Sequence, residues 1–188
     1  MTAASAGTGR RVLILAATTG VVLISAGLVC VGLPAGFSAW AHLRVPHAGC
    51  PPAGTLVQVD TAARILSLCR AGREEAFFRV ALGRGGIDKR IEGDFRTPLG
   101  RYALSPARSS ARFHLFLAVG YPTREQASRG LTGSAIGVHG PDIGYAWLGH
   151  ATILADWTLG CVALGTRDEV EQVARWVRRH SVGQIVIL

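Results

Sequence analysis

The chain has 188 residues, of which 49% are hydrophobic, so it is long enough for one domain with a substantial core and an additional segment. Its 24 Gly and 8 Pro give a turn-rich composition that argues against a helical bundle. The net charge is +8, but the basic residues are scattered and no aromatic ladder is interleaved with them, so a nucleic-acid-binding protein is a poor fit.

The N-terminal region indicates export from the cytoplasm. Arg10 and Arg11 precede the apolar run VLILAATTGVVLISAGLVCVGL, and no charged residue follows until Arg44. Roughly 20 apolar residues cross a bilayer, and positive charge before such a run favours a cytoplasmic N-terminus. We therefore expect a cytoplasmic segment at 1–11, a transmembrane signal-anchor at 12–33, a linker at 34–54 and an extracytoplasmic domain at 55–188.

A cleaved signal peptide is the alternative interpretation of this region. Ala39-Trp40-Ala41 has the small-x-small form that a signal peptidase recognises. Both interpretations place the domain outside the cytoplasm, and only the first makes the membrane a permanent partner.

The four cysteines differ in their surroundings. Cys30 lies in the apolar run and is interpreted as a packing residue. An oxidising compartment would allow Cys50 and Cys69 to pair, but the sequence does not set their Cα separation, so a disulfide and two free thiols both remain open. Cys161 is the candidate for a reactive thiol.

Strand patterns dominate the first part of the domain. TLVQVD at 55–60, ARILSLCR at 63–70 and AFFRVALG at 76–83 are separated by short spacers and predict an antiparallel sheet joined by hairpins. The polar, glycine-rich residues 84–100 predict a loop. Further strands are predicted at 101–104 and 113–120.

The middle of the domain predicts a short helix and two strands. TREQASRG at 123–130 has a helix start with a capping box and a glycine at its end. SAIGVHG at 134–140 and CVALG at 161–165 predict strands. Between them, 141–157 is a long connection that suits a loop or a lid over a cleft.

The C-terminal residues predict a helix followed by a strand. Thr166 and Glu169 form a capping pair, and the acidic residues lie in the first turn and the basic residues in the last, as the helix dipole favours. The expected buried stripe is Val170, Val173, Ala174 and Val177. QIVIL at 184–188 predicts the last strand.

Cys161 and His139 form the candidate reactive pair. A thiol is a weak nucleophile until a base or a cation raises its thiolate fraction, and a histidine that is near in the fold is the usual base. Gly160 allows a tight turn, so the amide N–H groups of Gly160 and Cys161 can point at a developing oxyanion. The alternative is a buried cysteine beside a structural histidine, with no catalytic role.

With these residues identified, the chain resembles the L,D-transpeptidase family of peptidoglycan enzymes over about Thr55–Leu188. The hallmark of the family is a histidine, a gap, and then Ser/Thr-x-Gly-Cys, which matches His139 and Thr158-Leu159-Gly160-Cys161. Similar stretches in the same order are VALGR at 80–84, EGDFRTPLGRY at 92–102 and FHLFLAVGYP at 113–122. Papain-like and cell-wall endopeptidase cysteine peptidases fit less well, because their cysteine precedes their histidine.

The chain departs from the family pattern at three positions. Leu159 stands where many members have histidine or another polar residue, Ala163 where many have arginine, and Thr166 where asparagine is usual. These departures leave the nucleophile and the base in place. They bear on which group of the substrate the site recognises, because side chains near the thiol contact that group.

The resemblance implies a mainly β fold, an L,D-transpeptidase-like β-sandwich or barrel with a C-terminal helix behind the transmembrane helix. It implies that Cys161 attacks the third residue of a peptidoglycan stem tetrapeptide, often meso-diaminopimelate, and expels the terminal D-alanine, while His139 activates the thiol. An amine then resolves the thioester. Peptidoglycan stem peptides are the expected partner, neither a cofactor nor a metal is expected, and the oligomeric state stays open.

Two other functions remain alternatives. A hydrolase on the same scaffold would act as an L,D-carboxypeptidase or as an amidase that releases a stem-linked protein. A non-catalytic cell-wall-binding module would use Cys161 only for packing.

Four more residues are candidates for substrate contact. Thr158 either orients the site or satisfies the turn. His114 lies in an apolar strand and either supports the site or is a satisfied core residue. Gly140 permits close backbone approach near His139, and Trp157 is either a cleft wall or part of the core.

The remaining polar candidates are weaker. His150 is a rival base, but its surroundings do not match the family pattern. Lys89, Arg90 and Arg96 lie in the polar loop, where they would either meet stem carboxylates or remain solvated.

Overall fold

The structure is a computed structural model that describes residues 46–188. The predicted transmembrane segment at 12–33 and most of the predicted linker at 34–54 lie outside the described residues. Within 46–188, the helices are too short or too polar to span a bilayer.

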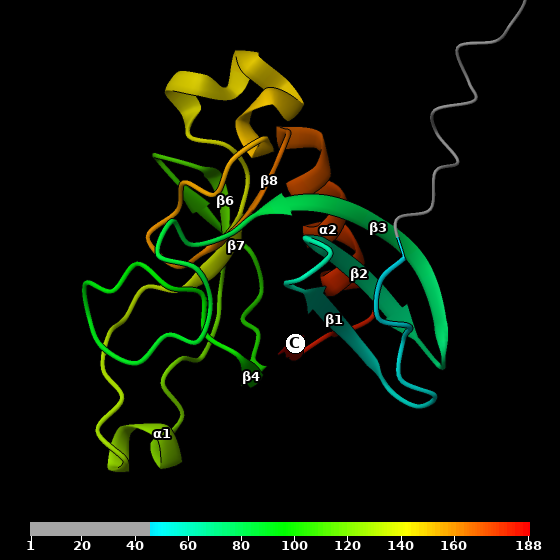
Figure 1. The fold of residues 1–188 in the computed structure, drawn as a ribbon. Helices are drawn as coiled ribbons and strands as arrows, with labels where there is room; N and C mark the ends of the chain where they lie inside the picture. Colours follow the sequence, from blue (N-terminus) through cyan, green and yellow to red (C-terminus); the bar gives the residue numbers. More distant parts are fainter. Residues whose placement is uncertain (1–45) are drawn as a thin grey trace, which may run out of the picture. The chain divides into compact units, whose positions relative to one another are not determined.

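The described residues form a mainly β fold around one strongly curled sheet of nine strands (Figure 1). The strands are β1 (Thr55–Asp60), β2 (Ile65–Arg70), β3 (Arg73–Ala81), β4 (Gly100–Ala103), β5 (Arg108–Ser110), β6 (His114–Ala118), β7 (Gly137–His139), β8 (Val162–Leu164) and β9 (Gln184–Ile187). Their order across the sheet is β4-β9-β1-β2-β3-β8-β7-β6-β5. The pairs β1–β9 and β7–β8 are parallel, and the other neighbours are antiparallel.

The strand β3 connects the two parts of this sheet. Most of its length pairs with β2, and its last residues pair with β8, where Val80 lies opposite Leu164. Figure 1 shows β3 as a long bent arrow. Beyond β4, Leu104 forms a bridge to Val119, so the chain after β4 lies against the chain after β6. The sheet therefore curls back on itself, and the predicted sandwich or barrel takes the form of one curled sheet.

Most predicted strands occur at their predicted places. The predicted hairpins between β1, β2 and β3 are confirmed by antiparallel pairing, and the alternating residues of these strands supply much of the core. The short strand β5 was not predicted, because RSS has no hydrophobic alternation. It pairs with β6, with Arg108 opposite Phe116.

The helices α1 (Arg124–Ser128) and α2 (Arg167–Arg179) both begin with the predicted capping boxes. Helix α1 ends with Arg129 as its C-cap, one residue before the predicted end. Helix α2 packs against β6 and β8. Its buried side chains are Val170, Val173, Trp176 and Val177.

Trp176 replaces Ala174 in the buried stripe expected for α2. Trp176 is 8% exposed, whereas Ala174 is only half-buried. The Trp176 Nε1 donates to Glu75 Oε2 at 2.7 Å, so the polar edge of the indole is satisfied. A tryptophan covers more of the sheet than an alanine, so the helix turns its larger side chain inward.

The connection at 141–157 is more ordered than a loop. It contains the 3-10 helix η2 (Ile143–Ile153), whose N-cap Asp142 accepts a hydrogen bond from Gly144 N at 3.0 Å. Gly149, with φ 54° and ψ −133°, interrupts the helix. The element leaves Trp147 and Leu154 on the surface, 80% and 86% exposed.

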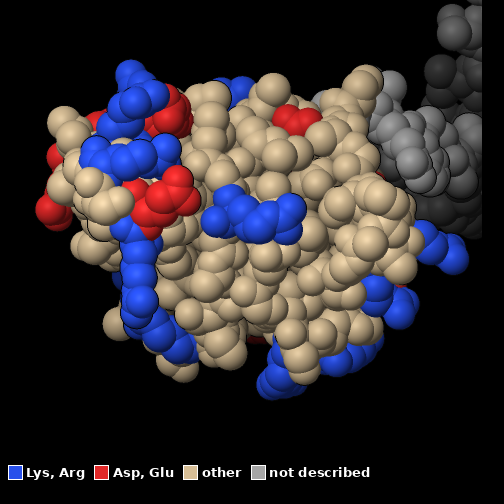
Figure 2. Space-filling view, turned by 90° about the horizontal axis from the view of Figure 1, so that it is seen from below, with Lys and Arg blue, Asp and Glu red and all other residues tan. Residues whose placement is uncertain are grey.

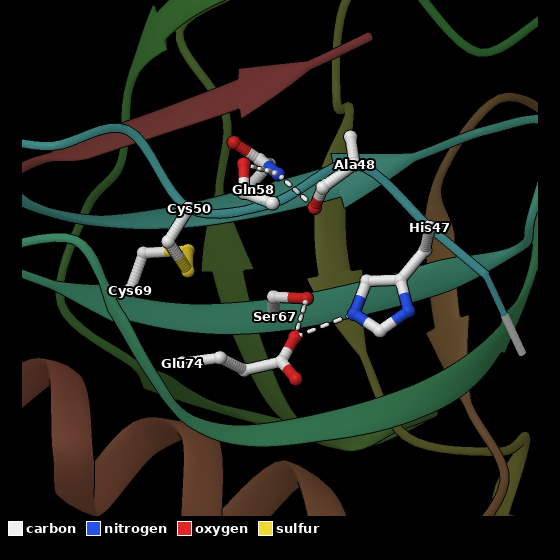
Figure 3. Close-up of a disulfide and its surroundings, with 8 residues drawn as sticks. His47, Ala48, Cys50, Gln58, Ser67, Cys69 and Glu74 are labelled. Atoms are coloured by element: carbon white, nitrogen blue, oxygen red, sulfur yellow. Dashed lines mark hydrogen bonds and ion pairs between the residues drawn. A yellow bond between two sulfur atoms is a disulfide. The ribbon is translucent and has the colours of Figure 1, made fainter. Parts of the chain in front are cut away.

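The first described residues are fastened to the sheet by a disulfide and by polar contacts (Figure 3). Cys50 and Cys69 are bonded, with a Cα separation of 5.4 Å, which answers the question that the sequence left open. Next to them, His47 Nε2 lies 2.7 Å from Glu74 Oε1, and the Ser67 hydroxyl donates to the same oxygen at 2.6 Å.

Basic side chains are dispersed over the surface rather than gathered in a single field. On the face shown in Figure 2, Lys and Arg form separate patches within a largely uncharged surface, and acidic side chains lie beside some of them. This distribution agrees with the scattered basic residues of the sequence.

Candidate active site

The parallel strands β7 and β8 bring His139 and Cys161 to one place. His139 is the last residue of β7, and Cys161 immediately precedes β8. The register places Val138 opposite Val162 and His139 opposite Ala163. Both residues line one cavity of about 760 Å³, which is within the range of small-molecule sites. Residues far apart in the sequence therefore share one cavity.

His139 is held by aromatic rings and is 1% exposed. The Phe113 ring stacks on the imidazole with centroids 3.9 Å apart and an interplanar angle of 18°. The Trp157 ring meets it edge-on at 5.8 Å. Because the rings enclose it from different directions, the imidazole has little freedom to turn.

The hydrogen bond of His139 determines which ring nitrogen is free. Its Nδ1 lies 2.6 Å from the carbonyl oxygen of Gly140. A carbonyl only accepts, so we assign the proton to Nδ1, which leaves Nε2 with a lone pair. Burial lowers the pKa of His139 to about 4, although the Gly140 hydrogen bond opposes the shift. The imidazole is therefore neutral at neutral pH and suited to accept a proton at Nε2.

Cys161 is half-buried, and its thiol is also neutral at rest. Burial raises the pKa of the Cys161 thiol, while a hydrogen bond from the Gly137 backbone and the positive charges of Arg112 and Lys89 lower it. The Sγ atom lies 3.5 Å from the carbonyl oxygen of Ala135 and donates to it. The free site thus holds a neutral thiol and a neutral imidazole in one cavity rather than a preformed ion pair.

A tight turn places Cys161 at the entrance of β8. The buried Thr158 hydroxyl donates to the Cys161 carbonyl at 2.7 Å and accepts from Gly160 N at 3.1 Å. Gly160 has φ +123°, and a Cβ there would lie 2.6 Å from the carbonyl oxygen of Arg96. Only glycine fits this position without displacement of the backbone.

The matching family model is YkuD, the L,D-transpeptidase catalytic domain, and it matches residues 54–187. The chain belongs to this family. A comparison with curated proteins finds no significant match.

Solved structures share the fold of this L,D-transpeptidase domain. The chain is 25% identical to the helical cell shape determining protein Pgp2 from Campylobacter jejuni, with a TM-score of 0.60 over 71% of this chain and 46% of Pgp2. It is 19% identical to Bd1075 from Bdellovibrio bacteriovorus, with a TM-score of 0.52 over 76% of this chain and 51% of Bd1075. The chain spans about half the length of these two structures.

The turn corrects one expectation for the candidate site. We expected the N–H groups of Gly160 and Cys161 to face an oxyanion, but the Gly160 N–H already donates to the Thr158 hydroxyl. The Cys161 N–H is therefore the remaining candidate. Thr158 satisfies the turn, and it also lines the cavity.

Gly140 and His114 do not line the cavity that holds Cys161. Gly140 contributes its carbonyl to His139, and a Cβ on Gly140 would lie 3.1 Å from Val170 Cγ1, so this glycine orients the imidazole and allows close packing. His114 Nε2 lies 2.9 Å from Glu171 Oε1 on α2, and its side chain is 40% exposed. His114 thus joins a strand to a helix outside the site.

His150 also lies outside the cavity, which argues against it as the base. Its side chain is 67% exposed, and its Nε2 lies 2.8 Å from Glu169 Oε1. The contact joins η2 to the first turn of α2.

Trp157 forms a wall of the cavity rather than part of the core. It lines the cavity with Cys161 and also a mainly apolar pocket beside η2. Its Nε1 is buried and has no hydrogen-bond partner within residues 46–188. A bound ligand or a water is the natural acceptor for this donor.

Lys89 is buried, so of the two alternatives given for this loop residue the solvated one is wrong. It is 4% exposed, lines the cavity and donates to Asp94 Oδ1 at 2.8 Å. Hydrogen bonds from Lys89 and from backbone N–H groups hold the pKa of the Asp94 carboxyl well below its usual range, although burial opposes them. Arg90 and Arg96 are exposed, as expected for this loop.

Sequence reasoning missed the aromatic and basic residues contributed by β5, β6 and the turn between them. Arg108, Arg112, Phe113 and Phe116 all line the cavity. The family-like stretch that begins at Phe113 was a signal for the two aromatic residues. Arg108 and Arg112 carried none, because their positions follow from the pairing of β5 with β6 and from the turn between these strands.

Proposed function

We propose that this domain transfers the acyl group of a peptidoglycan stem tetrapeptide through a thioester on Cys161. Membership of the L,D-transpeptidase family supports the substrate class. The observation that carries the proposal is the shared cavity, in which the half-buried thiol of Cys161 accompanies an imidazole whose Nε2 is free.

The first half-reaction forms the thioester. The Cys161 thiol passes its proton to Nε2 of His139 as Sγ attacks the carbonyl carbon of the third residue. The C–N bond to the terminal D-alanine then breaks, and His139 returns the proton to the departing amine. Because both groups are neutral at rest, the proton moves during the attack rather than before substrate arrives.

The second half-reaction consumes the thioester. An acceptor amine attacks the thioester carbonyl and gives up a proton to His139, the C–S bond breaks, and the sulfur regains its proton. The Cys161 N–H is the proposed donor to the oxyanion in both steps. Removal of one such donor costs about 10²–10³-fold in comparable acyl-transfer sites.

Intact-mass measurement of the protein with a stem tetrapeptide tests this proposal. The expected mass gain equals the tetrapeptide less D-alanine, and Cys161→Ala should show none. His139→Gln keeps the thiol and should slow acylation by about 10²–10⁴-fold, because it removes the general base. A carbapenem provides a second acylating probe.

The products distinguish transfer from hydrolysis. With an acceptor amine present, a new amide indicates a transferase, whereas free tripeptide alone indicates a carboxypeptidase. An unmodified Cys161 after exposure to both tetrapeptide and carbapenem would refute catalysis and favour a wall-binding module.

We further propose that the domain acts outside the cytoplasm, held by the segment at 12–33, on the peptidoglycan that sets cell shape. The apolar run behind two arginines supports export, and the similarity to a cell shape determining protein supports the physiological setting. Proteolysis of the domain in cells with a permeable outer layer and an intact inner membrane tests the location. Muropeptide profiles and cell morphology of a strain that lacks the protein test the role.

A further inference from the structure

The cavity that holds Cys161 and His139 has an excess of positive charge. Its basic lining residues are Arg84, Lys89, Arg108 and Arg112, and its acidic lining residue among those described is Glu92. Two of the cations are neutralised within the protein. Lys89 pairs with Asp94 at 2.8 Å, and Arg112 pairs with Asp142 at 2.7 Å.

Arg84 and Arg108 make no side-chain hydrogen bond or ion pair within residues 46–188. Each guanidinium instead lies over an aromatic ring. The Cζ of Arg84 is 4.2 Å from the ring centroid of Phe95, and the Cζ of Arg108 is 4.9 Å from that of Phe116. A cation–π contact positions the guanidinium plane but leaves its N–H donors unused.

Arg84 stands on the cysteine side of the cavity. It follows the end of β3, and its backbone N–H donates to the carbonyl of Thr158 at 2.9 Å. The Thr158 hydroxyl in turn holds the Cys161 carbonyl. The backbone that carries Arg84 is therefore bonded directly to the turn that carries the thiol.

Arg108 stands on the histidine side. In the sheet, Arg108 lies opposite Phe116, and Phe116 lies opposite His139. The Phe116 and His139 rings are nearly parallel, with centroids 6.0 Å apart. One aromatic ring therefore separates the guanidinium from the imidazole.

Neither of these arginines is needed to tune the thiol. The cations that lower the pKa of Cys161 are Arg112 and Lys89, both of which are already paired with carboxylates. Arg84 and Arg108 thus retain free charge, free donors and a defined position. A planar guanidinium with free N–H donors matches the two oxygens of a carboxylate.

We infer that Arg84 and Arg108 bind two carboxylate groups of the acyl donor and so select peptides that carry both. One carboxylate is the free C-terminus of the residue that leaves, and the other belongs to the side chain of the residue that is attacked. The Glu92 carboxylate, which also makes no side-chain ion pair in the described residues, suits an ammonium on that same side chain. The inference rests on the proposed function and adds the charge pattern of the substrate.

The test uses one stem tetrapeptide in three forms, with diaminopimelate at its third position. The first form has both carboxylates free, the second has a C-terminal carboxamide, and the third has a carboxamide on the diaminopimelate side chain. The measurement is the second-order rate constant for acylation of Cys161 in the full chain. The wild type should prefer the free acid over each amide by about 10- to 100-fold, the range expected for one charge-assisted hydrogen-bonded contact.

The variants Arg84→Gln and Arg108→Gln should each bring one of these two preferences close to one. Arg79→Gln is the matched control, because Arg79 is exposed on β3, has no side-chain partner in the described residues and lies outside the cavity. It should preserve both preferences. Alkylation of Cys161 by iodoacetamide reports whether each variant retains an intact site.

Three results would overturn the inference. The first is that the wild type is acylated at the same rate by all three peptides. The second is that Arg84→Gln or Arg108→Gln slows acylation by all three peptides equally. The third is that substitution of only one of the two arginines changes a preference for a free carboxylate. If no peptide acylates the wild type, the proposed function fails separately. Binding of the three peptides to Cys161→Ala, measured by calorimetry, then decides the inference, because carboxylate recognition needs no thiol.

Discussion

At the scale of single residues, the neutral imidazole of His139 links the candidate active site to the stability of the fold. A histidine in an unfolded chain titrates near pH 6.5, whereas burial lowers the pKa of His139 to about 4. Between these values the unfolded chain binds a proton that the folded chain does not. Stability should therefore fall as the pH falls through this window.

His139→Gln should remove this contribution. The wild type should lose about 3 kcal/mol more unfolding free energy than the variant between pH 7 and pH 4, as urea denaturation would measure. The other histidines are common to both proteins, so their contributions cancel in the difference. Equal pH slopes for the two proteins would contradict a buried, neutral His139.

Thr158 makes a second prediction at this scale. Thr158→Val removes both hydrogen bonds of the hydroxyl and should cost about 2 kcal/mol, because two buried backbone groups lose their partner. Thr158→Ser retains the hydroxyl and is the control. Urea denaturation measures the loss, and the rate of Cys161 alkylation should change with it because the turn loosens. If Thr158→Val were as stable as the wild type and Cys161 were alkylated at the same rate, the turn would keep its conformation without the hydrogen bonds of Thr158.

Residue types with a chemical signature were found from the sequence, and residues that act through their backbone or register were not. Cys161 and His139 stood out because a thiol, a glycine before it and a histidine suggest acyl transfer. The Gly140 carbonyl carries no such mark, since every residue has one. Arg108 enters the cavity only because β5 pairs with β6 in one register, which a polar three-residue strand does not reveal.

At the scale of elements, the N-terminus of α2 is held by more than its own cap. The Thr166 hydroxyl accepts from Glu169 N at 3.2 Å, and Glu169 Oε2 accepts from Gly165 N at 2.9 Å and from Thr166 N at 3.1 Å. The other oxygen of Glu169 meets His150 of η2. The start of α2 thus joins the end of β8 to the connection that contains η2.

Thr166→Ala should destabilise the domain by about 1 kcal/mol, the usual cost of an N-cap. Thr166→Ser should recover most of this loss because it restores the acceptor. The measurement is the urea midpoint at constant m-value. An Ala variant as stable as the wild type would mean that Glu169 alone secures the helix start.

Elements with a periodic pattern or a cap were predicted closely, and elements that depend on tertiary contacts were not. The capping boxes of α1 and α2 are local, so they can be recognised from four residues. The helix η2 has no buried residue and no clear amphipathic period, so its pattern could not be told from a loop. Trp176 faces inward because of the shape of the neighbouring sheet, which no local pattern records.

At the scale of the whole molecule, the disulfide Cys50–Cys69 closes a loop with a sequence separation of 19. A closed loop of this size restricts the unfolded chain and is worth about 3 kcal/mol in the chain-entropy model. Reduction should therefore lower the Tm of the wild type. The double variant Cys50→Ser, Cys69→Ser should have this lower Tm both with and without reductant. A wild type whose Tm does not change on reduction would indicate that local contacts such as His47–Glu74 hold this segment without the disulfide.

The arrangement of the strands could be predicted only where neighbours in sequence are neighbours in space. The hairpins of β1, β2 and β3 followed from their short spacers. The placement of β9 between β4 and β1, and of β8 between β3 and β7, depends on contacts between distant segments. One sequence without a record of co-varying positions does not contain that information.

The bent strand β3 belongs to both parts of the curled sheet, and its last residues lead directly to Arg84. The part that carries the disulfide and the part that carries the thiol therefore share one continuous strand, and its pairing with β2 and with β8 ties their positions together. To divide this domain into two complementing fragments, a protein engineer should therefore keep β3 intact. A cut in the exposed connection around η2 is the better choice.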